Sequence, residues 1–310
     1  MKILFCLIFP LLPFLMIAQT TRISGTAPGA EGRKIEVVGW SDLVTRLEKP
    51  LAQAIVDSTA SFTLSFSNSK TISVFLAIDF HQGELFIEPG KTYNISIAPL
   101  NYNEMQEVNP FVESQSLEIT ILENKPDELN ALIQAFNKEY NVFVLENFNL
   151  LYQEKDKARL DTFRVKMMRK FHDVKQSYFN DYVRYKLGSL EQVANVMGKS
   201  PMVKKYFYDS QILYDNVEYM DFFDEFFSKY ITAASRPLKF LNYSAMIDGP
   251  NSYAALMKAL ETDTLLRRPQ LRELVLLRNL MEMWDDPAYK QPGIGNVLSL
   301  IHISEPTRPY

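Results

Sequence analysis

Apolar and polar residues alternate along the first third of the chain, as they do in strands that bury one face. The clearest case is residues 61–67, where Phe62, Leu64 and Phe66 are separated by single polar residues. The same pattern predicts further strands at residues 23–26, 34–40, 52–56, 72–80, 84–87 and 93–97. Short strands divided by turn residues predict an antiparallel β-sandwich at residues 19–105.

A tight turn is predicted at residues 88–91. Pro89 suits the second position of a type II turn, and Gly90 supplies the positive φ of the third. The turn connects the strands at 84–87 and 93–97, so the sequence predicts a hairpin between them.

The apolar period lengthens to about 3.6 residues after residue 126, which indicates helices. Four stripes follow this spacing: Leu129, Leu132, Ile133, Phe136 and Tyr140; Leu160, Phe163, Met167 and Phe171; Tyr178, Tyr182 and Tyr185; and Phe222, Phe223, Phe226, Phe227 and Tyr230. Asp263 is predicted to cap a last helix, through residues 271–284. Residues 127–297 therefore form an all-α helical domain. Residues 106–126 are predicted to be a linker. Within it, apolar and polar residues alternate over 112–122, which indicates one more strand.

Strands first and helices afterwards predict the α+β class, with the two kinds of element segregated along the chain.

The first 18 residues have the features of a secretory signal peptide. Lys2 is followed by an almost wholly apolar run to Ile17, and cleavage is expected after Ala18. The run is shorter than the ~20 residues of a membrane span, although an uncleaved anchor is the alternative. No later segment is apolar enough to span. We expect an exported protein of the periplasm or cell envelope, with no stable membrane span after signal removal.

The last residues, 298–310, read LSLIHISEPTRPY. This stretch resembles the translation of an adapter used to build DNA sequencing libraries, and a genuine proline-containing tail is the alternative. The resemblance implies that residues 298–310 are non-native and that the native sequence continues beyond Val297 in a different way.

Composition narrows the function further. A net charge of −4 offers no basic footprint for nucleic acid. The one cysteine, Cys6, lies inside the predicted signal peptide. After cleavage the chain would hold no disulfide, no thiolate nucleophile and no metal site built on cysteine.

The remaining candidate chemistry is weak. His81 and His172 each lack a nearby second histidine, so no metal site is predicted. Charged helix surface explains the acidic groups Asp221/Asp224/Glu225 and Asp285/Asp286 better than paired catalytic carboxylates do. Asn94 and Asn242 begin glycosylation-type triplets, a pattern that is common by chance. The sequence predicts no catalytic, cofactor-binding or metal-binding residue in this chain, and no cofactor.

Three stretches resemble periplasmic thioredoxin-like (TlpA-like) thiol:disulfide oxidoreductases of the Bacteroidetes type. They are residues 86–93, FIEPGKTY; 216–227, NVEYMDFFDEFF; and 271–280, LRELVLLRNL. The likeness covers about residues 20–297. The family's reactive Cys-x-x-Cys is absent from this sequence. In the family that motif lies in a thioredoxin domain that follows the region compared. The resemblance implies a parent enzyme that exchanges disulfides, with this chain as its non-catalytic positioning or partner-binding module. Its partners would be protein substrates or a redox partner in the envelope.

The alternative hypothesis is a stand-alone envelope protein that binds a peptide or glycan or acts as a scaffold. A hydrolase has little support, since the sequence has neither G-x-S-x-G nor H-E-x-x-H.

Overall fold

The computed structural model describes residues 19–100, 115–122, 125–208, 210–232 and 242–304. The chain forms two compact units, and it passes between them after Gly39, after Leu47 and after Asn124. The first unit is built of strands and the second of helices. Residues Trp40–Leu47, which connect two strands, belong to the helical unit.

Two sheets form the β unit. The first contains, in spatial order, β4 (Ser61–Asn68), β1 (Gln19–Thr26), β7 (Thr92–Ile97) and β9 (Ile119–Ile121). The second contains β3 (Glu48–Ile55), β2 (Lys34–Trp40), β5 (Ile72–Ile78), β6 (His81–Ile87) and β8 (Gln115–Ser116). Inward residues of both sheets share one apolar core, which includes Ile23, Leu64, Val37 and Leu76. This is a sandwich, as the alternation predicts.

The predicted α+β order, strands and then helices, is confirmed. The pairing is more varied than the antiparallel prediction. Four described pairs are antiparallel, but β1 pairs with β7, and β6 with β8, in parallel. Both sheets are therefore mixed.

The predicted hairpin at residues 84–97 is wrong, although its turn is present. Gly90 has the expected positive φ of 70°, and the Lys91 N–H donates to the Glu88 carbonyl over 3.4 Å. However, β6 and β7 lie in different sheets. The reason is that both edges of β6 are occupied, by β5 and by β8, so β7 pairs with β1 and β9.

The segment predicted as a linker, 106–126, contributes strands. β8 and β9 lie within it, where the alternation of residues 112–122 predicts one more strand. β9 closes the edge of the first sheet by pairing antiparallel with β7.

The helical unit contains nine α-helices in the described residues. They are α1 (Leu129–Tyr152), α2 (Lys157–Lys170), α3 (Ser177–Val193), α4 (Lys199–Val203), α5 (Val217–Phe227), α6 (Tyr243–Ile247), α7 (Ser252–Leu260), α8 (Pro269–Met283) and α9 (Gln291–Ser304). A π-helical turn, η2 (Lys204–Tyr208), follows α4, and a 3₁₀ turn, η4 (Thr264–Leu266), precedes α8.

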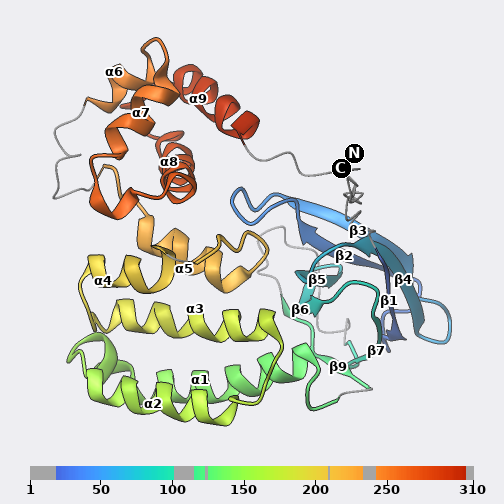
Figure 1. Ribbon diagram of the computed structural model, residues 1–310. Coiled ribbons are helices and arrows are strands. Elements are labelled where there is room, and N and C mark those ends of the chain that lie inside the picture. Colours follow the sequence, from blue (N-terminus) through green and yellow to red (C-terminus); the bar gives the residue numbers. More distant parts are fainter. Residues whose placement is uncertain (1–18, 101–114, 123–124, 209, 233–241, 305–310) are drawn as a thin grey trace, which may run out of the picture. The chain divides into compact units, whose positions relative to one another are not determined.

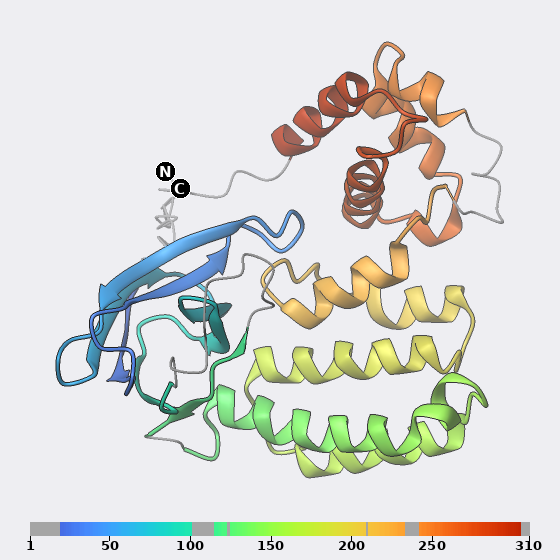
Figure 2. The same cartoon turned by 180° about the vertical axis from the view of Figure 1, so that it is seen from behind.

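Helices α1, α2 and α3 run side by side, as both views show (Figures 1 and 2). Most residues of the predicted stripes are buried: Leu129, Leu132, Ile133 and Phe136 on α1; Leu160, Phe163 and Met167 on α2; and Tyr182 and Tyr185 on α3. Tyr140, Phe171 and Tyr178 are only partly buried, and Phe179 is buried beside the α3 stripe. The rings of α5 pack against α3, where Tyr219 meets Tyr185 edge to face with centroids 4.7 Å apart. Large aromatic side chains thus pack together at this interface.

One prediction about the last helices needs correction. Asp263 caps the 3₁₀ turn η4 by accepting from the Leu265 N–H, and α8 begins separately at Pro269. Pro269 suits the first helical turn, where its missing N–H is not needed. α9 runs across residue 298, and Ile301 is buried in the helical core. A foreign origin of residues 298–310 stays a prediction.

The signal-peptide residues 1–18, including Cys6, lie outside the described residues. Within the described part of the chain, no helix is both long enough and apolar enough for a bilayer crossing.

Candidate functional site

A groove of about 500 Å³ lies between α2 and α3, and most of its lining is apolar. The two helices are set in place by their N-terminal caps. Asp156 accepts from the Arg159 N–H at the start of α2, and Gln176 accepts from the Phe179 N–H at the start of α3. Phe171 closes α2 and packs its ring against Phe179 at 5.0 Å.

The floor of the groove is formed by buried side chains that also serve the core. They are Met167, Phe179, Leu187 and Tyr206. Met168 stands at the edge and is 61% exposed, which is unusual for so large an apolar side chain. The groove therefore offers apolar surface that no other described residue covers.

The walls of the groove carry positive charge. Arg164, Arg184, Lys205 and His172 line it, and no aspartate or glutamate does. Arg184 donates to the Lys205 carbonyl over 2.7 Å, and its guanidinium lies 5.8 Å from the centroid of the Tyr206 ring. These contacts hold Arg184 at the groove without neutralising it.

One buried carboxylate lies behind this wall. Glu191 is 2% exposed; it accepts from Lys205 Nζ over 2.6 Å and from the Tyr206 hydroxyl over 2.9 Å. Arg164 Nη1 lies 3.9 Å from it. Burial and the Glu191 charge raise the pKa of Tyr206, so its hydroxyl stays protonated and donates. Glu191 offsets Lys205, and Asp161 pairs with Arg164 over 3.2 Å, which leaves Arg184 as the permanent cation of the groove without an ion-pair partner among the described residues.

A second groove, of about 540 Å³, separates α1 from α2. Its lining mixes the acids Glu139, Glu146 and Asp156 with the bases Arg159 and Lys166. Glu139 accepts from Lys166 and Lys170, each over 2.8 Å, and these hydrogen bonds lower its pKa to about 2. The charges of this groove largely satisfy one another.

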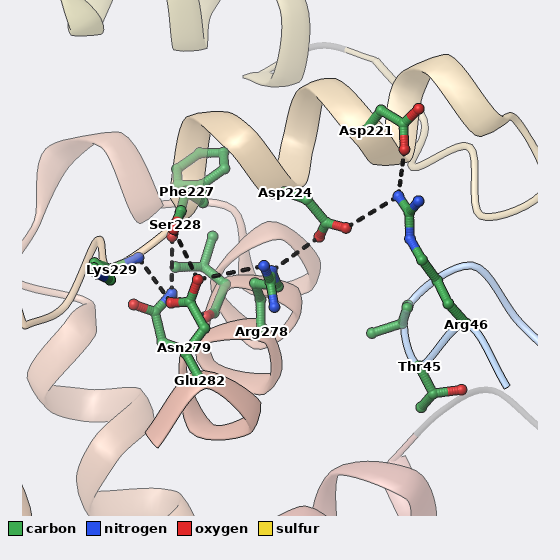
Figure 3. A network of polar contacts seen from close by, with 12 residues as sticks. Thr45, Arg46, Asp221, Asp224, Phe227, Ser228, Lys229, Arg278, Asn279 and Glu282 are labelled. Atoms are coloured by element: carbon green, nitrogen blue, oxygen red, sulfur yellow. Dashed lines mark hydrogen bonds and ion pairs between the residues drawn. The ribbon is translucent and has the colours of Figure 1, made fainter. Parts of the chain in front are cut away.

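The acidic group on α5 belongs to a structural network (Figure 3). Arg46 bonds Asp221 and reaches Asp224 over 3.3 Å, while Arg278 of α8 lies 3.2 Å from Asp224. Glu282 of α8 accepts from the Ser228 hydroxyl over 2.8 Å, at the end of α5. The network joins three segments of the helical unit.

The other candidate residues lie apart from one another. His81 begins β6, is 4% exposed and stacks on Phe80 with ring centroids 4.7 Å apart. His172 is exposed beside Asp173 and lines the α2–α3 groove. Asp286 accepts from the Ala288 N–H in a turn. The described residues contain no group of three or more potential metal ligands.

Asn94 and Asn242 have structural contacts. Asn94 accepts from Ser24 between adjacent strands, and Asn242 caps α6.

Sequence reasoning missed Arg164, Arg184 and Lys205 as neighbours. They come from α2, α3 and η2, about twenty residues apart in turn, so no local motif marks them. The chain matches no protein-family model, and a search of curated proteins found no match.

Proposed function

We propose that this chain is the non-catalytic N-terminal region of an exported thioredoxin-like thiol:disulfide oxidoreductase, in which it positions or binds protein partners. The enzyme assignment rests on the resemblance of residues 86–93, 216–227 and 271–280. Those stretches contain the turn after β6, helix α5 and most of α8, and they contribute core residues such as Phe222 and Leu274. Such positions preserve a fold, and they carry no chemistry of their own.

The binding role is carried by one observation, an exposed apolar face on α1. Val142, Leu145, Phe148 and Tyr152 follow at intervals of three, three and four residues, and all are exposed. Leu145 is 82% exposed, and Phe148 stacks on Tyr152 at 4.4 Å. Contiguous apolar surface of this kind marks sites of protein association. A disulfide-exchanging enzyme needs such a surface for protein substrates that display apolar segments.

Partner binding is tested by placing a charge on this face. Leu145→Lys should weaken binding of a reduced, alkylated and therefore unfolded protein by about tenfold, as loss of a central apolar contact does. Gln134→Lys, at an exposed polar position of the same helix, is the matched control. Equal binding by both variants and the unaltered protein would contradict the proposal.

The redox parentage is tested by reading the native coding DNA past codon 297. An open frame that encodes a Cys-x-x-Cys thioredoxin domain is the expected result. A stop codon directly after that position would remove the oxidoreductase assignment.

The alternative function is a stand-alone envelope protein that binds a peptide or glycan or acts as a scaffold. The grooves on either side of α2 favour it, because they give this chain recesses of ligand size without a further domain. The same DNA reading separates the two functions.

A further inference from the structure

We propose that the groove between α2 and α3 binds a small amphipathic carboxylate, with its carboxylate at Arg184 and Arg164 and its acyl chain on the apolar floor. This site is separate from the exposed face of α1, and it would stand whether or not the parent protein is an oxidoreductase.

The shape and floor fit an acyl chain. The groove has a volume of about 500 Å³, within the range of small-molecule sites. Its floor is Met167, Phe179 and Leu187, and Met168 extends the apolar surface to the rim. Methionine adapts its shape readily, which suits a flexible ligand.

The charge of the walls selects an anion. Three permanent cations line the groove. Lys205 pairs with Glu191 over 2.6 Å and Arg164 pairs with Asp161 over 3.2 Å, so Arg184 is the one without an ion-pair partner among the described residues. This excess positive charge would repel a cationic ligand, and a neutral ligand would bring no negative charge to pair with it.

Arginine geometry favours a carboxylate in particular. The Nε–H of Arg164 is buried and has no hydrogen-bond partner among the described residues. Its Nη2 pairs with Asp161 over 3.2 Å. Arg184 has no carboxylate within ion-pair distance among the described residues, and its hydrogen bond to the Lys205 carbonyl uses one of its five N–H donors. Guanidinium groups in this state bind carboxylates through two parallel hydrogen bonds.

The test is equilibrium binding of decanoate to the purified protein by calorimetry. Decyltrimethylammonium carries the same chain with the opposite charge, and butyrate carries the same head with a short chain. Decanoate should bind, and both comparison compounds should bind at least about tenfold more weakly.

Variants connect the binding to this groove. Arg184→Gln should weaken decanoate binding by about tenfold, since an exposed arginine can be replaced without loss of folding, as unchanged circular dichroism would show. Arg169→Gln makes the same charge change on α2 outside the groove and should leave binding unaltered. No decanoate binding, equal binding of the cation, or equal effects of the two variants would overturn the assignment.

Discussion

Asn279 satisfies several buried backbone groups with a single side chain. Its Nδ2 donates to the carbonyl of Phe227 (Figure 3) and to that of Val275. Its Oδ1 accepts from the Ile231 N–H over 2.9 Å. The side chain is 1% exposed, so water cannot replace these bonds. Asn279 therefore joins the end of α5 to α8 through the backbone.

Replacing it should be costly. Asn279→Ala leaves the Ile231 N–H buried without its partner, while the Phe227 carbonyl keeps only its hydrogen bond from the Tyr230 N–H. The helical unit should lose about 1–3 kcal/mol of unfolding free energy. Trp40 and Trp284, the only tryptophans of the sequence, both belong to this unit, so urea unfolding followed by fluorescence measures the loss. Asn149→Ala, at an exposed position, should change little. Similar losses in both variants would show that the hydrogen bonds do not matter.

Glu139 should make the stability of the helical unit depend on pH. Hydrogen bonds from Lys166 and Lys170 lower its pKa from 4.5 to about 2. Because the folded pKa is lower than the unfolded one, the ion pairs stabilise fully above pH 4.5, and this contribution is lost as the pH falls towards 2. The side chain is partly exposed, so solvent screening keeps the contribution small.

The stability of Glu139→Gln should therefore fall less steeply between pH 4.5 and pH 2 than that of the unaltered protein. Urea unfolding across this range measures the two slopes. Glu154→Gln, at an exposed position just after α1, is the control and should follow the unaltered protein. Parallel curves for Glu139→Gln and the unaltered protein would rule the effect out.

At the scale of elements, glycine sets how closely two strands approach. Gly25 of β1 lies opposite Ile95 in the parallel pair with β7, and a Cβ there would collide with the Ile95 carbonyl oxygen. In α9, a Cβ on Gly295 would meet only Trp284, at an ordinary distance of 3.7 Å. The same substitution should therefore act with opposite sign at the two positions.

Gly25→Ala should destabilise the β unit by about 1–3 kcal/mol, the cost of forcing a methyl group into packed structure. Hydrogen exchange in β1 and β7 should become faster. Gly295→Ala should leave the helical unit unchanged or stabilise it by up to ~1 kcal/mol, since alanine favours a helix interior. Unchanged exchange in Gly25→Ala would mean that β1 and β7 separate easily.

The periodic elements could be predicted from the sequence because their signals are local. The alternation at 61–67 and the stripe from Leu129 to Phe136 depend only on which side of one element is buried. The sequence could not predict that β6 pairs with β8 and not with β7, because β8 follows almost thirty residues later. The groove could not be predicted either, since Arg164, Arg184 and Lys205 become neighbours only after α2, α3 and η2 have packed.

At the scale of the whole molecule, the segment Trp40–Leu47 is the notable feature. It leaves the β unit between β2 and β3, and Leu43 is buried in the helical core. Arg46 reaches Asp221 and Asp224 of α5. The helical unit is therefore incomplete without residues that precede it by more than eighty positions.

Leu43→Ala should reduce the stability of the helical unit by about 2 kcal/mol or more through loss of buried contacts. Leu47→Ala is a close control, because Leu47 lies in the same segment and is 64% exposed. Loss of helical circular dichroism on heating measures both. If Leu43→Ala and Leu47→Ala have the same melting temperature, the segment does not contribute to the helical core.

This arrangement also has a consequence for synthesis on the ribosome. Arg46 and Asp221 are 175 residues apart. At about 5–20 residues per second, α5 emerges roughly 9 to 35 seconds after the segment that it needs. During this interval Leu43 lacks the α5 part of the helical core and is exposed to water. For that period the nascent chain displays an apolar loop, which chaperones of newly made proteins could bind before α5 does.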